Sequence, residues 1–338
     1  MRKAGILRAA AAAILGAALF TGASVSGLQA KTLKLGHSLA GGDHPYHLGA
    51  LKFKEILEAK SDGKIKVEIF PNSQLGGERD MVEGLKIGTV DLVIAAATLG
   101  GSIANDRKVY LVAMPFIFKD YDAVDRVLEG DIGNEMSQNW PSAGFRNVGY
   151  FIAGFHNLAN SKKPIRTPAD FKGMKMRAIQ SKAMTLQINT LGPNAVPMAF
   201  PEVYTGIQQG VVDGFANSLT TFYLKKYYEV APYISVSRHG VGILSLMMSE
   251  KSYQGFSDAE RKMIDEAGVE AARYQRGLYR EGDKKYLEEL KKVANVNTDV
   301  DREAFKKYTA GFTEQFVELV GEPGAEDFAK RMLAEGAK

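Results

Sequence analysis

The pattern of apolar and polar positions in the first part of the chain changes between strand-like and helix-like periods. Residues 64–70 alternate apolar and polar side chains, as a half-buried strand does. Strands are also expected at 32–36 and, as a buried apolar run, at 91–96. Between these strands, apolar side chains three to four residues apart predict one helix starting near Pro45, and a second spans about 78–87. Strands that alternate with helices favour a parallel α/β sheet.

The α/β pattern begins again after Gly154 and gives way to a helical last third. The expected elements are a short helix start at 167–170, a strand at 174–178, helices at 181–190 and 201–209, and a buried strand at 211–216. Ser257 and Glu260 form a capping box at the start of a proline-free stretch to Val293. We therefore predict two similar lobes braced by one long helix, with a kink expected near Gly282.

The N-terminus has the features of an export signal. Arg2, Lys3 and Arg8 precede an apolar run of about a dozen residues, and small residues lead to Ala30. This run is shorter than the ~20 residues that a bilayer span requires, so we expect a cleaved signal peptide, residues 1–30, rather than an anchor. Cleavage near Ala30 lowers the net charge from +4 to +1, which argues against a nucleic-acid partner.

The absence of cysteine narrows the chemistry further. With no cysteine in the sequence, disulfides, thiolate metal sites, cysteine nucleophiles and a lipid anchor are excluded. His44 and His47 are close enough to share a metal, but they lack further ligands, so we predict capping or surface histidines. No phosphate-binding loop or dinucleotide fingerprint occurs, and we predict no cofactor and no metal.

One tract suggests an enzyme. Residues 36–40 resemble the nucleophile elbow of α/β-hydrolases, with Ser38 in the nucleophile position and Ala40 in place of the last glycine. That elbow normally follows a central strand with several others upstream, whereas only a few residues of the mature chain precede this one. We therefore interpret the tract as a strand end that leads into a binding loop, and predict no catalytic residue.

A family resemblance is carried by several tracts in the same order along the chain, residues 35–37, 71–79, 88–91, 160–165, 170–177, 197–204, 208–214 and 227–230. Over almost the full mature length they resemble the DctP-type substrate-binding proteins of TRAP (tripartite ATP-independent periplasmic) transporters. The resemblance implies a two-lobed periplasmic binding protein, type II-like, with the ligand in a cleft between the lobes. We expect residues 31–153 plus about 243–280 in lobe I, and residues 154–242 plus about 281–338 in lobe II.

The resemblance also implies the residues that bind the ligand. In the family, the arginine that ends Gly-x-Lys-x-Arg forms a salt bridge with the ligand carboxylate, and here that residue is Arg177. A guanidinium suits this role because its planar fork matches a carboxylate. Asn217 corresponds to an amide near the carboxylate, and Phe200 to an aromatic ring against the ligand. Glu78, Ser38 and His156 complete the set of expected ligand-binding residues.

The sequence departs from the family pattern at two places. Many members carry a second arginine where this chain has His156, which we predict to donate a hydrogen bond to the ligand. The strand end at 95–99 offers one hydroxyl, that of Thr98, where polar ligand contacts are common. One cation and apolar walls suit a monocarboxylate better than a highly polar sugar acid. Aromatic, keto, hydroxy and C4-dicarboxylic acids all stay open.

These inferences predict a monomeric, non-enzymatic periplasmic protein that captures a small organic acid anion and delivers it to the permease subunits of a TRAP transporter. One alternative is a receptor that presents its ligand to a sensor kinase. Another is an exported serine hydrolase that uses Ser38.

Overall fold

The computed structural model describes residues 30–338. The predicted signal peptide, apart from Ala30, lies outside these residues. In the described part, nine strands form one sheet in the order β2-β1-β3-β8-β4-β7-β5-β6, with β9 paired to β8. The strands are β1 (Lys31–His37), β2 (Ile65–Phe70), β3 (Leu92–Ala96), β4 (Phe145–Asn160), β5 (Lys175–Ala178), β6 (Asn194–Pro197), β7 (Gly214–Asn217), β8 (Tyr233–Ser249) and β9 (Asn295–Asn297).

Two long antiparallel strands join two parallel units. β1 pairs in parallel with β2 and β3, and β5 pairs in parallel with β6 and β7. Between these units lie β4 and β8, of 16 and 17 residues, which pair with each other and with β7 and β3 in antiparallel fashion. The sheet is therefore mixed, whereas the sequence pattern predicted a parallel one.

Helices cover the sheet on both faces. The α-helices are α1 (Pro45–Lys60), α2 (Glu78–Ile87), α3 (Ala97–Ala104), α4 (Tyr121–Glu129), α5 (Asp131–Glu135), α6 (Lys182–Leu191), α7 (Val203–Gln208), α8 (Leu219–Leu224), α9 (Glu250–Gln254), α10 (Asp258–Lys291), α11 (Arg302–Thr309), α12 (Thr313–Val320) and α13 (Ala325–Ala337). Short 3-10 helices are η1 (Lys108–Ala113), η2 (Trp140–Ala143), η3 (Pro168–Phe171), η4 (Phe200–Glu202), η5 (Tyr227–Glu229) and η6 (Ala310–Phe312). Within residues 30–338, no helix is long and apolar enough to span a membrane.

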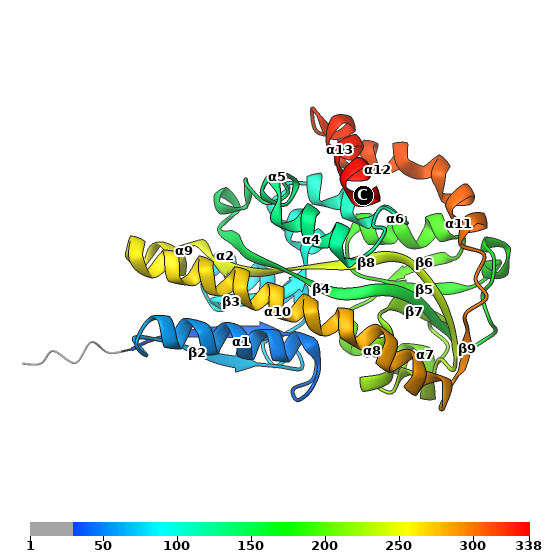
Figure 1. The fold of residues 1–338 in the computed structure, drawn as a ribbon, viewed down its shortest axis with the longest axis horizontal. Helices are drawn as coiled ribbons and strands as arrows, with labels where there is room; N and C mark the ends of the chain where they lie inside the picture. Colours follow the sequence, from blue (N-terminus) through cyan, green and yellow to red (C-terminus); the bar gives the residue numbers. More distant parts are fainter. Residues whose placement is uncertain (1–29) are drawn as a thin grey trace, which may run out of the picture.

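The long helix α10 braces the molecule. It extends along the sheet from the end formed by β1–β3 to the end formed by β5–β7 (Figure 1). It begins at the predicted capping box, where the Ser257 amide donates to Glu260 Oε2 at 2.8 Å. Its 34 residues continue through Gly282 without interruption. The brace predicted from the sequence is therefore present as a single helix.

The two halves of the sheet meet at an irregularity in the β4–β8 ladder. Ile152 pairs with Ile243, the next pair joins Phe155 to Val241, and the register shifts between them. Gly154 lies in this gap with a φ of 77°, which a glycine adopts without strain. The break coincides with the expected lobe boundaries, which stay a prediction. In the last part of the chain, α11 contacts α6, whereas α13 contacts α4 and α5 of the first half.

Candidate functional site

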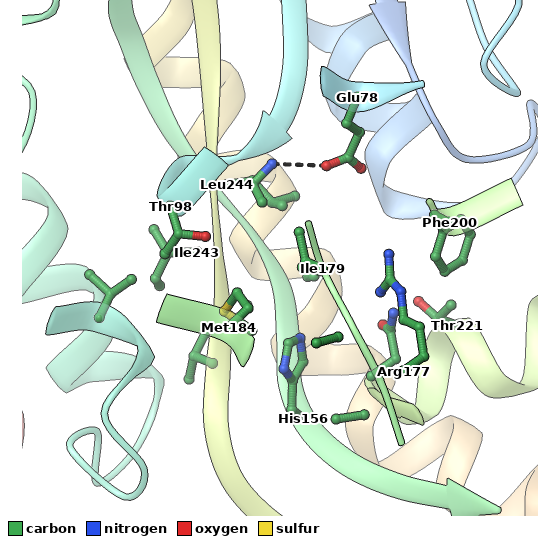
Figure 2. Close-up of a pocket in the computed structure, with 18 of the residues that line it drawn as sticks. Glu78, Thr98, His156, Arg177, Ile179, Met184, Phe200, Thr221, Ile243 and Leu244 are labelled. Atoms are coloured by element: carbon green, nitrogen blue, oxygen red, sulfur yellow. Dashed lines mark hydrogen bonds between the residues drawn. The ribbon is translucent and has the colours of Figure 1, made fainter. Parts of the chain in front are cut away.

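A cavity lies between the two halves of the sheet, beside the break in the β4–β8 ladder. Its walls come from β4 and β8 at the break, from the C-terminal ends of β5 and β7, from the starts of α1, α2 and α3, and from α6 and α8. Five of the six predicted ligand-binding residues line it: Glu78, His156, Arg177, Phe200 and Asn217. Figure 2 shows the first four of these around the central space. Ser38 is absent from the lining.

Arg177 supplies the positive charge in this lining. It lies near the C-terminal end of β5, the short strand between β6 and β7, and its side chain enters the cavity (Figure 2). Only 6% of the residue is exposed, and burial lowers the pKa of its guanidinium. Its Nε donates to the Met198 carbonyl at 2.9 Å, and the guanidinium lies 5.7 Å from the centre of the Phe200 ring. Among residues 30–338, no carboxylate forms an ion pair with it.

Glu78 and Ser38 form one hydrogen-bonded unit on the opposite wall. Glu78 is the first residue of α2, and its Oε1 accepts from the Ser38 hydroxyl at 2.6 Å. Its Oε2 accepts from the amide of Ala96 at 3.2 Å, at the junction of β3 and α3. Glu78 therefore fixes two loops of the first half and places a negative charge facing Arg177. The Ser38 hydroxyl is committed to a carboxylate, not to a histidine.

His156 is a neutral polar group in the middle of the cavity. It is 3% exposed on β4, and burial together with the nearby charge of Arg177 lowers its pKa to about 4. In the described chain, its Nδ1 is buried without a hydrogen-bond partner. Gly242 of β8 packs so closely beneath the ring that a Cβ there would lie 2.4 Å from Nε2, which no side chain permits. A neutral imidazole with a free nitrogen can donate to, or accept from, a ligand oxygen.

Asn217 and Phe200 flank Arg177. Asn217 ends β7, and its Oδ1 accepts from the Ser218 amide at 2.8 Å, which leaves its amide NH₂ available to donate. Phe200 packs edge-on against Tyr227, with ring centres 5.9 Å apart. This contact fixes the ring beside the guanidinium, so the wall next to the charge is aromatic.

Sequence reasoning missed several lining residues. Tyr46 at the start of α1 was predicted only as part of a helix face, and Thr221 and Met184 were not singled out. The run from Val241 to Leu244 on β8 also lines the cavity, but β8 was not predicted. The apolar run at 240–247 was the available signal for a buried strand. What no pattern reveals is that this strand crosses the middle of the molecule.

The histidines of the first helix have structural roles. His44 is the N-cap of α1, as the capping prediction has it, and its Nδ1 accepts from the Tyr46 amide at 3.3 Å. His47 contacts His37, with Nδ1 and Nε2 3.2 Å apart. Within the described part of the chain, no three histidine, aspartate or glutamate side chains gather where they could hold a metal.

Comparison with known proteins identifies the family. Residues 35–318 match the family model described as DctP, bacterial extracellular solute-binding protein, family 7. The 2,3-diketo-L-gulonate-binding periplasmic protein YiaO of Escherichia coli is 29% identical over 283 residues, 83% of this chain and 85% of the relative. The C4-dicarboxylate-binding periplasmic protein DctP of Rhodobacter capsulatus is 30% identical over 294 residues, 86% of this chain and 87% of the relative.

A solved structure gives the same answer for the fold. The sugar acid binding protein DctPAm of Advenella mimigardefordensis, in complex with galactonate, superimposes with a TM-score of 0.85 at 27% identity, covering 91% of this chain and 98% of the other. Two lobes around a cleft are therefore the architecture of this chain, as the sequence predicted. The family binds substrates for transporters and is not enzymatic, which excludes the hydrolase that Ser38 suggested. The chain belongs to the DctP family of TRAP periplasmic solute-binding proteins.

Proposed function

We propose that this protein captures a small monocarboxylate in the cleft between its lobes and delivers it to the permease subunits of a TRAP transporter. The observation that carries the proposal is the buried guanidinium of Arg177, which has no carboxylate partner within the described residues. A buried guanidinium that makes no direct ion pair is costly, and an anionic ligand that contacts it would relieve this cost. Membership in an organic-acid-binding family supports the same assignment.

The relatives bind acids with different numbers of carboxylates. The charges that line this cavity therefore indicate which kind of acid it suits. YiaO binds 2,3-diketo-L-gulonate and DctPAm holds galactonate, acids with one carboxylate, whereas the R. capsulatus relative binds C4-dicarboxylates. A second carboxylate would be held most strongly by a second cation. The charged residues that line this cavity are Arg177 and Glu78, and His156 is neutral above a pH of about 4. This inventory favours a monocarboxylate.

Export and domain motion belong to the same proposal. The family is periplasmic, and we propose that the signal peptide is cleaved after Ala30. We further propose that the lobes are residues 31–153 plus about 243–280, and 154–242 plus about 281–338. Support for a hinge between them comes from the register shift beside Gly154 and Gly242. A monomer suffices for this function, because the cavity is lined within one chain.

Titration calorimetry tests the anchor. With the best binder from a panel of 2-hydroxy, 2-oxo and dicarboxylic acids, we expect Arg177→Ala to lose about 2–5 kcal/mol, a roughly 30- to several-thousand-fold loss of affinity. Arg177→Lys should restore part of the loss, because lysine keeps the charge but not the fork. Arg166, with a side chain 61% exposed, provides the control: Arg166→Ala should bind like the wild type. If Arg177→Ala binds within about threefold of the wild type, ~0.7 kcal/mol, the assignment is wrong.

A further inference from the structure

The cavity is polar on one side and apolar on the other. In Figure 2, Arg177, Phe200 and Thr221 lie on one side of the space, and Thr98, Met184 and Ile243 lie on the other. His156 lies between them. A ligand whose carboxylate meets Arg177 therefore extends its chain past His156 towards the second side.

The second side is built almost entirely from hydrocarbon. Its apolar lining residues come from η1, α6 and the middle of β8 and pack in one cluster, and they are Val112, Met184, Val241 and Ile243. All except Met184, at 8%, are no more than 4% exposed, so this wall is closed to bulk water. Thr98 carries the one hydroxyl on this side, and within residues 30–338 its Oγ1 is buried without a partner.

This wall distinguishes methyl groups from hydroxyl groups on the ligand. A methyl group placed here is removed from water and gains close contacts. A hydroxyl group placed here loses its water partners, and within residues 30–338 the buried lining atoms left without a partner are those of Thr98 and His156. The cavity leaves about 40 Å³ open to the centres of water-sized molecules, a few times the roughly 10–15 Å³ that one water needs. The chain that fits is short.

We propose that the ligand is a short acid with a branched aliphatic chain and at most two oxygens beyond its carboxylate, one facing His156 and one facing Thr98. Polyhydroxylated acids of the same length are rejected by the apolar wall. This inference rests on the proposed function, in which Arg177 holds the carboxylate.

Two acids of similar size test the preference by titration calorimetry. The probes are 2-hydroxy-3-methylbutanoate and 2,3,4-trihydroxybutanoate, which share a carboxylate and a 2-hydroxyl group. We expect the methylated acid to bind at least tenfold more tightly, since each unpaired buried hydroxyl costs roughly a factor of ten. Equal or tighter binding of the trihydroxy acid would overturn the inference, and so would failure of both acids to bind.

Variants of the wall provide the second arm. Val112→Thr and Val241→Thr keep the side-chain shape and replace one methyl group with a hydroxyl group, so each should reduce the preference ratio at least threefold. Val127→Thr changes a buried valine of α4 outside the cavity and should leave the ratio unchanged. A ratio measured on one preparation does not depend on the folded fraction. An unchanged ratio in both wall variants contradicts the inference, whereas unchanged binding in Arg177→Ala contradicts the proposed function instead.

Discussion

Four of the five histidines of this chain are buried, and burial keeps their pKa values below the range near neutral pH. His37, His44 and His239 have pKa values lowered to about 3, and His156 to about 4, chiefly because burial disfavours the charged imidazolium. Each is at most 3% exposed. These four residues are therefore neutral in the folded protein at neutral pH.

The lowered pKa values predict that acid destabilises the fold. An unfolded chain binds a proton on each histidine near pH 6.5, whereas the folded chain binds it only near pH 3–4. Between these values the unfolded state holds more protons, so the free energy of unfolding falls as the pH falls from 6.5 to 4. At pH 5, each such histidine accounts for about 2 kcal/mol of lost stability relative to neutral pH.

Urea unfolding at pH 7.5 and pH 5 measures this effect. The wild type should lose several kcal/mol, and His156→Gln should lose about 2 kcal/mol less than the wild type over the same change in pH. His47 is only partly buried and forms the control, so His47→Gln should change the pH dependence much less. Equal pH dependence for His156→Gln and the wild type would show that His156 is not held neutral.

Single residues of the site were predictable where a tract fixes both the backbone and the side chain. Arg177 follows a four-residue pattern that ends a strand, and the structure places its side chain in the cavity. Tyr46 and Thr221 were missed, because a tyrosine on an apolar helix face and a threonine near a cap are common outside binding sites. Their place in the cavity depends on how α1 and α8 approach each other: His44 Nε2 lies 3.3 Å from Thr221 Oγ1.

At the scale of elements, α10 is held against β4 by unusually close backbone contacts. A Cβ on Gly149 of β4 would lie 2.6 Å from the Gly268 carbonyl oxygen, and a Cβ on Gly268 would collide with the carbonyl of Val148. Two turns further along, the buried Gln275 side-chain amide accepts from the Ile152 amide at 3.0 Å and donates to its carbonyl at 2.7 Å. These bonds satisfy β4 where its ladder with β8 is interrupted.

Two glycines of α10 should respond to alanine in opposite directions. Alanine normally stabilises a helix interior by about 0.5–1 kcal/mol relative to glycine. Gly277→Ala should show this gain, since a Cβ there meets nothing within 4 Å. Gly268→Ala should instead cost about 1–3 kcal/mol, because helix and strand must separate. Urea denaturation measures both. A stabilised Gly268→Ala protein would mean that the helix does not pack this closely on β4.

Several short elements followed from periodicity, whereas the two longest strands did not. α2 spans the predicted 78–87, and β2, β3 and β5 lie within a residue of the expected bounds. β4 and β8 escaped prediction because both faces are buried along most of their length, so no alternation marks them. The mixed sheet and the break beside the cavity depend on these two strands. The family tracts, not the periodicity, therefore led to the site.

At the scale of the whole molecule, several polar contacts connect the halves across the cleft. His44 on α1 meets Thr221 on α8, and the Arg79 guanidinium on α2 lies 3.5 Å from the Gln180 carbonyl beyond β5. Arg79 and Gln180 each adjoin a cavity-lining residue, Glu78 and Ile179. In the proposed lobe motion, contacts of this kind form only when the lobes are closed around the cavity. A ligand that touches both walls therefore favours this arrangement over an open one.

Small-angle scattering should detect this closure. A compact domain of about 300 residues has a radius of gyration near ~19 Å, and an open two-lobed molecule exceeds that value. Saturating 2-hydroxy-3-methylbutanoate should lower the radius of gyration towards it without changing the mass. Closure requires a ligand with higher affinity for the closed state, and in the proposed function Arg177 of β5 supplies the main attraction. Arg177→Ala with the same acid should therefore keep the scattering curve of the free protein. Identical curves for free and bound wild type, at concentrations where calorimetry shows saturation, would indicate a rigid, preformed site instead of two moving lobes.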